Sequence, residues 1–280
     1  MRLILFLALL VPSSTLYGQD YIKAKVIDEE TGKGVPFVNI GVKELGIGTV
    51  SNSNGQFTLE LKDSKYPVIF SSIGYEVIFI PYDNLKTLQI IKLKPKTEML
   101  EEVVVTSKKY NKDVILGYKL DKKGHSVGFG SRALGTEIGA HCKIKKETFL
   151  KTANFTLNFT GTDSLLFRVN IYKLNQGTIG DKLVDQDIII RTIQQKGTIT
   201  IDLEPFNIIV KDDILLALEW IEDDNGKGNS GIMFRAKKSA SSSNLYTKQT
   251  SFAPFLKLSQ MIPDAPLINI GFYLEAEEID

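Results

Sequence analysis

The chain has few of the residues that most often carry enzyme chemistry. Its 280 residues include one cysteine, Cys142, and two histidines, His125 and His141. A single cysteine excludes an internal disulfide framework and a cysteine-rich zinc site. The histidines lie sixteen positions apart, and neither has the closely spaced second ligand of a catalytic zinc site. We therefore expect no cofactor and no zinc-dependent hydrolysis.

An excess of charge of either sign is also missing. Lysine and arginine number 34 against 33 aspartate and glutamate residues, so the formal net charge is +1. A chain so close to neutrality has no overall field to attract nucleic acid or an anionic membrane surface. We expect no nucleic-acid partner. Hydrophobic residues make up 43% of the chain, which is enough to form the cores of folded domains.

Hydrophobic runs are short, and the clearest one lies at the N-terminus. Residues 3–11 are apolar, follow Arg2, and precede Pro12 and a patch of serine and threonine that ends near Gly18. The run is too short to cross a bilayer core of about 30 Å, and it has the pattern of a cleavable signal peptide. We predict a signal peptide at 1–18 and a mature chain from Gln19. The mature protein would have no transmembrane span and would be periplasmic, outer-membrane-associated or secreted.

The next eighty or so residues have the periodicity of short β-strands. Ile22, Ala24 and Val26 alternate with lysines, as in a strand with one solvated face. An Asn-Gly turn at 52–55 lies between two short apolar runs, which predicts a β-hairpin. No segment has a helical period. The pattern predicts a small β-sandwich over residues 19–95.

The motifs of this region, in this order, resemble those of a known family. The segments KVIDEETGKGVPFVNIGVKELGIGTVSNSNGQFTLEL, PVIFSSIGYEV and IIKLKP are similar to the carboxypeptidase regulatory-like domain. The resemblance implies a transthyretin-like β-sandwich that is common in exported proteins of Bacteroidetes-type bacteria. It does not imply a peptidase here, because both histidines lie outside this domain. The family commonly has an acidic residue before the glycine turn, where this chain has asparagine and serine, so we expect no cation in that loop.

Residues 96–124 are rich in lysine and glutamate, and we interpret them as a linker between two domains that fold separately. TonB-dependent outer-membrane receptors have a similar EEVVVT stretch after a regulatory-like domain, where it resembles the energy-coupling box. Such a run can add as a strand to the sheet edge of a partner. It also fits a last strand or a connector, because β-branched residues favour strands in general. The candidate partner-binding strand comprises Glu101, Glu102, Val103, Val104, Val105 and Thr106.

Residues 125–280 again alternate with a period of two. Strands with one apolar face are predicted at 155–160, 167–172 and 198–203. Residues 188–190 and 214–221 are apolar on both faces and are predicted to be central strands. The number and spacing of the strands predict a jelly-roll-like β-sandwich. The predicted protein is therefore all-β, with a small transthyretin-like sandwich followed by a larger jelly-roll-like one.

The second domain has three candidate features for binding. Tyr172 and Tyr246 are candidate ligand-binding residues, because the apolar faces of sugars stack on aromatic rings. Trp220 ends an apolar strand and is expected in the core. A weak calcium candidate is a loop with oxygen ligands, although a solvated hairpin loop explains the same composition. Its residues are Asp223, Asp224, Asn225 and Asn229.

We interpret the chain as an exported, non-enzymatic binding or scaffold protein of the bacterial cell envelope. Its partner would be an envelope protein or a glycan. The alternative is a carbohydrate-binding accessory protein of a glycan-uptake system, which needs a solvent-facing aromatic platform or a concave polar face on the second domain. A hydrolase is not expected, because the sequence has no convergent set of acid, base and nucleophile.

Overall fold

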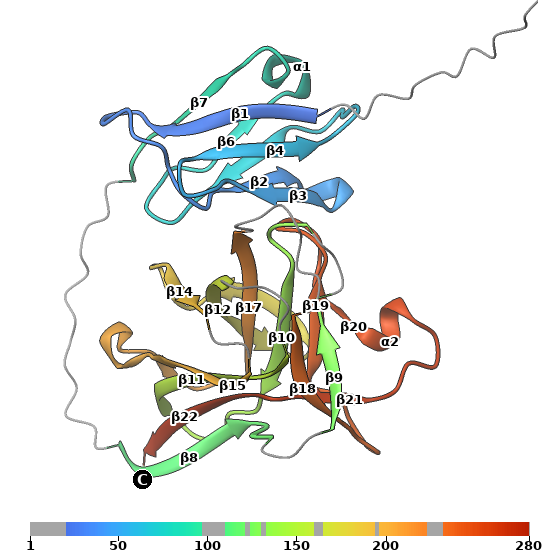
Figure 1. Ribbon diagram of the computed structural model, residues 1–280. Coiled ribbons are helices and arrows are strands. Elements are labelled where there is room, and N and C mark those ends of the chain that lie inside the picture. The colour runs from blue at the N-terminus through green and yellow to red at the C-terminus, as the bar shows by residue number, and fades with distance from the viewer. Residues whose placement is uncertain are drawn as a thin grey trace, which may run out of the picture.

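The computed structural model describes residues 21–96, 110–120, 124–129, 133–159, 165–193, 196–222 and 232–279. Strands dominate these residues, which confirms the all-β prediction. Figure 1 shows two units, which we call the N-terminal unit (21–96) and the C-terminal unit (110–279). The described helices are single turns: α1 (Tyr82–Leu85), α2 (Leu258–Met261) and the 3-10 turns Lys43–Leu45 and Glu204–Phe206. The predicted signal peptide lies outside the described residues.

The N-terminal unit is a sandwich of two sheets, with strand orders β4-β1-β7 and β3-β2-β5-β6. Val26, Ile40 and Phe70 are fully buried between the sheets. The strands are β1 (Tyr21–Asp28), β2 (Asn39–Val42), β3 (Ile47–Val50), β4 (Gln56–Glu60), β5 (Val68–Ser71), β6 (Ile78–Ile80) and β7 (Ile90–Leu93).

The predicted Asn-Gly hairpin is wrong, although the turn itself forms. The amide of Gly55 donates to the carbonyl of Asn52 at 2.9 Å, but the flanking strands β3 and β4 belong to different sheets. Gly55 has a φ of +81°, and a Cβ there would lie 2.3 Å from the carbonyl oxygen of Val26 on β1. The turn therefore packs closely on β1, and the chain passes there from the sheet that contains β3 to the sheet that contains β4.

The C-terminal unit is a larger sandwich of a seven-stranded and an eight-stranded sheet. The first sheet has the order β13-β12-β17-β10-β19-β20, with β14 also paired to β12. Its strands are β10 (Glu137–Cys142), β12 (Leu165–Asn175), β13 (Thr178–Lys182), β14 (Ile188–Thr192), β17 (Ile214–Glu222), β19 (Leu245–Lys248) and β20 (Leu256–Lys257).

The eight-stranded sheet has the order β21-β18-β11-β22-β8, with β15 and β16 on β11 and β9 on β18. Phe272 lies in the core between the sheets, with ring centroids 4.7 Å from Phe155 and 4.9 Å from Phe234. The strands are β8 (Tyr110–Gly117), β9 (His125–Gly128), β11 (Thr148–Phe159), β15 (Gly197–Asp202), β16 (Ile209–Val210), β18 (Met233–Lys238), β21 (Ile268–Ile270) and β22 (Phe272–Ile279).

Of the two strands predicted to be central, one is central in its sheet and the other is not. Strand β17 lies between β12 and β10 and is buried along almost its whole length, with Trp220 in the core as expected. Strand β14 pairs only with β12 among the described strands, and Ile189 is exposed. A short apolar run does not distinguish a central strand from an edge strand, so this second prediction is wrong.

Part of the predicted linker is a strand of the C-terminal unit. Strand β8 pairs with β22 from Tyr110 opposite Ile279 to Gly117 opposite Tyr273. Lys112 on this strand forms a cross-strand ion pair with Glu278 at 3.2 Å. The second sandwich therefore begins inside the range 96–124. Separate folding of the two units stays a prediction.

The two units meet through β2 and β3, which face the ends of β10, β17 and β19 (Figure 1). Phe37 and Val50 pack with Leu166 and Ile221 in a small buried cluster. The hydroxyl of Ser251 donates to the carbonyl of Thr49 at 3.0 Å, across the same contact. Apolar packing and hydrogen bonds together hold β3 against the loop that follows β19.

Substitution of Gly48 tests this contact. A Cβ at Gly48 would lie 2.3 Å from Ser251 Oγ and 3.2 Å from the carbonyl oxygen of Ile40. We expect Gly48→Val to destabilise the protein by about 1–3 kcal/mol, because it overpacks a buried contact, and to increase the radius of gyration by small-angle scattering. Gly180→Val is the control, since its Cβ would lie at an ordinary 3.5 Å from Lys173. Unchanged scattering for Gly48→Val would show that the contact does not hold the units together.

Candidate functional site

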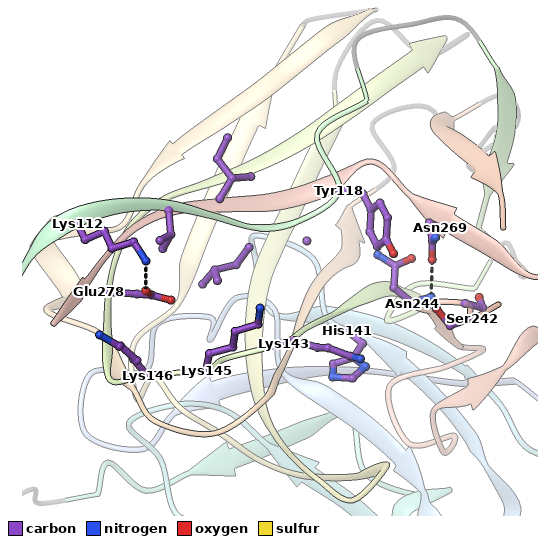
Figure 2. A pocket seen from close by; sticks show the side chains of 15 residues that line it. Lys112, Tyr118, His141, Lys143, Lys145, Lys146, Ser242, Asn244, Asn269 and Glu278 are labelled. Atoms are coloured by element: carbon purple, nitrogen blue, oxygen red, sulfur yellow. Dashed lines mark hydrogen bonds and ion pairs between the residues drawn. The ribbon is translucent and has the colours of Figure 1, made fainter. Parts of the chain in front are cut away.

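A cavity of about 570 Å³ lies at the open end of the C-terminal sandwich. Edge strand β8 of one sheet forms one wall, and the end of β10 in the other sheet, with the loop that follows it, forms another. Strand β19 pairs with β10 only as far as Ala140, whereas β17 pairs with it up to Cys142. His141 lies on this last part of β10 and lines the cavity, and the lysine-bearing loop begins after Cys142. Residues 242–244 and Asn269 close the remaining side (Figure 2).

One end of the cavity is basic. Lys112, Lys145 and Lys146 line this end together with Glu278, and Lys143 lies beside His141, closer to the middle of the cavity (Figure 2). Lys112 neutralises Glu278, and Figure 2 shows this ion pair. The other three lysines are exposed, and none forms an ion pair with a described residue. The cavity therefore has a local excess of positive charge that the chain's net charge does not reveal.

The other end of the cavity presents neutral polar groups and one aromatic ring. Figure 2 shows Tyr118, Asn244 and Asn269 there, away from Lys112 and Lys146. Asn269 Oδ1 accepts the backbone N–H of Asn244 at 3.0 Å, and Asn244 Oδ1 accepts the N–H of Ile270 at 2.9 Å.

The amide nitrogen of Asn244 is a buried donor without an acceptor. The residue is only 5% exposed, and Nδ2 has no hydrogen-bond partner among the described residues. An unpaired buried donor costs about 1–3 kcal/mol. Native proteins keep few such groups, and a donor at a cavity wall is suited to an acceptor on a ligand.

His141 lies in the cavity wall and is held by a carboxylate. Its Nε2 is 2.7 Å from Asp213 Oδ2, and Asp213 Oδ1 accepts the N–H of Ile144 at 2.9 Å. This pair fixes the start of the lysine-bearing loop. Sequence reasoning missed it because the two residues are 72 positions apart.

The surroundings of His141 do not include an activated nucleophile among the described residues. No described serine, threonine or cysteine side chain forms a hydrogen bond with the imidazole. The neighbouring thiol of Cys142 is fully buried, and burial raises its pKa to about 12. A thiol with such a pKa is not a nucleophile at neutral pH. The arrangement can bind and orient an anion, and we assign no bond-breaking step to it.

Comparison with known proteins gives the N-terminal unit a family. Residues 22–105 match the family model of the CarboxypepD_reg-like domain. The N-terminal unit is a carboxypeptidase regulatory-like domain. This match confirms the resemblance seen in the sequence motifs.

Two TonB-dependent receptors of Formosa agariphila are similar to parts of the chain. One is 26% identical over 152 residues, which cover 54% of this chain and 14% of the receptor. The other is 29% identical over 115 residues, which cover 41% of this chain and 10% of the receptor. The chain therefore spans only a small part of the length of these relatives.

Two solved structures are distantly similar. A clostridial cysteine protease after propeptide cleavage has a TM-score of 0.43 and 10% identity, and covers 87% of this chain and 66% of that one. The cysteine protease and lectin-like domains of a surface layer associated protein of Clostridium difficile have a TM-score of 0.40 and 10% identity. The second match covers 83% of this chain and 51% of that one.

The structure corrects the predicted aromatic platform. Tyr172 and Tyr246 are 7% and 3% exposed, so neither ring faces solvent. The hydroxyl of Tyr172 donates to the buried carboxylate of Glu137, and its ring packs on Phe255 at 5.3 Å between centroids. The loop after β19 covers this face of the sheet, which strand alternation does not predict.

The other predicted site residues lie outside the described residues. They are the candidate partner-binding strand, Glu101 to Thr106, and the calcium candidates Asp223, Asp224, Asn225 and Asn229. In the part of the chain that is described, no three histidine, cysteine, aspartate or glutamate residues are grouped as metal ligands. Within the same ranges, no helix is both long and apolar enough to span a membrane.

Proposed function

We propose that this protein is an exported, non-enzymatic binding protein of the bacterial cell envelope, and that the cavity holds an anionic ligand. The envelope setting is supported by the regulatory-like domain and by the relatives, which are TonB-dependent receptors. The signal-peptide pattern of residues 1–18 supports export. Periplasmic, membrane-associated and released forms are all compatible with these observations.

The observation that carries the proposal is the trio Lys143, Lys145 and Lys146. Three unpaired ammonium groups on one loop repel one another, and an anion in the cavity would relieve that repulsion. The Asp213–His141 pair holds the start of the loop, so the backbone that carries the lysines is ordered before a ligand arrives. A preorganised site loses less free energy to ordering when the ligand binds.

Charge removal at the loop tests the proposal. We expect the triple variant Lys143→Gln, Lys145→Gln, Lys146→Gln to bind anionic polymers roughly 3- to 100-fold more weakly, since each exposed ion pair contributes about 0.2–1 kcal/mol. Isothermal titration calorimetry with polygalacturonate, polyglutamate and polyphosphate measures this change. Raising the salt concentration should weaken binding by the wild type more than by the variant.

A matched control removes three exposed lysines from the regulatory-like domain. The variant Lys33→Gln, Lys43→Gln, Lys65→Gln has the same net charge as the loop variant and should bind like the wild type. Equal weakening in both variants would mean that the overall charge, not the cavity, attracts the polymers. Binding of none of the three polymers by the wild type would contradict the proposal. Turnover of any bound polymer would contradict its non-enzymatic part.

A further inference from the structure

We infer that the ligand of the cavity is an acidic saccharide, a chain of sugar rings that carry carboxylates. This inference rests on the proposed function and names its ligand class. The lysines would bind the carboxylate, the amide of Asn244 would donate to a ring or hydroxyl oxygen, and Tyr118 would pack against the apolar face of a ring.

The position of Tyr118 is set by the backbone before it. Gly117, the last residue of β8, has a φ of +93°, and a Cβ there would lie 2.5 Å from the carbonyl oxygen of Phe272. That carbonyl accepts the N–H of Tyr118 at 3.1 Å. The glycine therefore turns the chain sharply at the end of the strand and places the Tyr118 ring at the cavity. The ring is 38% exposed, as a stacking surface for a sugar must be.

The donor of Asn244 distinguishes a saccharide from a compact anion. Its carbonyl oxygen is committed to the N–H of Ile270, which fixes the orientation of the amide and leaves Nδ2 as the unpaired group. Figure 2 places Asn244 at the Tyr118 end of the cavity, away from Lys112 and Lys146. A ligand that satisfies both ends has charge at one position and neutral oxygen acceptors at another.

The signs of the charges in the wall support the same class. The carboxylate of Glu278 also lines the cavity, and although it pairs with Lys112 it can accept hydrogen bonds from sugar hydroxyls. Among the described residues that line the cavity there is no arginine, so these residues do not supply the bidentate forks typical of phosphate recognition. The volume of about 570 Å³ is within the range of about 300–1,000 Å³ for small-ligand pockets.

The test compares trisaccharides of galacturonate, mannuronate and glucuronate with their methyl esters and with tripolyphosphate, by calorimetry on the full protein. We expect at least one uronate trisaccharide to bind at least tenfold more tightly than its uncharged ester. Tyr118→Ala should weaken that binding about tenfold and change tripolyphosphate binding less than twofold. Tyr118→Phe, which keeps the ring, should stay within about threefold of the wild type.

Asn244→Asp is a second test variant. Its carboxylate still accepts the backbone N–H of Ile270, and an oxygen takes the place of the Nδ2 donor. It should weaken uronate binding more than tenfold, with circular dichroism reporting an unchanged fold. Binding of tripolyphosphate but of no uronate, or uronate binding that neither Tyr118→Ala nor Asn244→Asp weakens, would overturn the saccharide inference and leave the anion-binding proposal in place. Absence of binding by every charged ligand, or equal binding of uronates and esters, would overturn both.

Discussion

Replacement of Arg168 by methionine should lower the free energy of unfolding by about 3–5 kcal/mol, because it leaves a buried carboxylate without its cation. The Arg168 side chain is 3% exposed, and its Nη1 donates to Glu219 Oε2 at 3.0 Å. Glu219 is itself 1% exposed. Nη2 of Arg168 donates to the carbonyl of Phe37 at 2.6 Å, so the same side chain joins the two units. Urea denaturation at neutral pH measures the loss.

Arg191 provides a matched control for this prediction. It lies on the neighbouring strand β14 and forms an ion pair with Glu222 at 2.6 Å, but its side chain is 50% exposed. Arg191→Met should therefore change stability by no more than about 1 kcal/mol. Replacing both Arg168 and Glu219, with methionine and leucine, should restore part of the stability, because no unpaired charge stays buried. Equal decreases in the free energy of unfolding for Arg168→Met and Arg191→Met would contradict the prediction that burial makes the Arg168–Glu219 pair more important than the exposed pair.

The alternation of strand β12 was predictable, but the environment of its polar face was not. Phe167, Val169 and Ile171 face the core, as their period of two predicts. Arg168 and Asn170, on the opposite face, are also buried. Alternation shows that a face is polar, and it does not show whether water or protein covers that face. The partners here come from β10, β17 and the regulatory-like domain, and their pairing depends on tertiary structure.

The candidate site was predictable only in fragments. The sequence Lys143-Ile144-Lys145-Lys146 is a visible run of charge directly after the residues that form β10, and it was a signal that sequence reasoning did not use. Tyr118 lies within the stretch interpreted as a linker, because lysines around it have the composition of a solvated segment. Lys119, two residues after the end of β8, instead pairs with Glu275 of β22 at 3.5 Å. Composition alone does not show that a lysine in such a stretch has a carboxylate partner.

Acidification should remove about 3 kcal/mol of stability that Glu219 contributes. Burial alone raises the pKa of this carboxyl, but the charges of Arg168, Lys182 and Lys248 outweigh burial and lower the pKa from 4.5 to about 2. A carboxyl whose pKa is lower in the folded state stabilises the protein above its unfolded pKa, and that contribution is lost as the pH falls. The contribution of Glu219 is therefore lost as the pH falls from about 4.5 to about 2. The difference between its pKa values in the unfolded and folded chains sets how much stability is lost.

Glu219→Gln isolates this contribution from the general effect of acid. The variant should be less stable than the wild type at pH 6, because Arg168 loses its charged partner, and the two stability curves should converge near pH 2. Urea denaturation at steps from pH 6 to pH 2 measures the convergence. Glu76→Gln is the control, since Glu76 is half-exposed and pairs with Lys94 at the surface of the regulatory-like domain. At pH 6 this substitution should change the free energy of unfolding by no more than about 1 kcal/mol. A curve for Glu219→Gln parallel to that of the wild type would mean that the Glu219 carboxylate has the same pKa in the folded and unfolded chains, so that Arg168 does not favour its charged form.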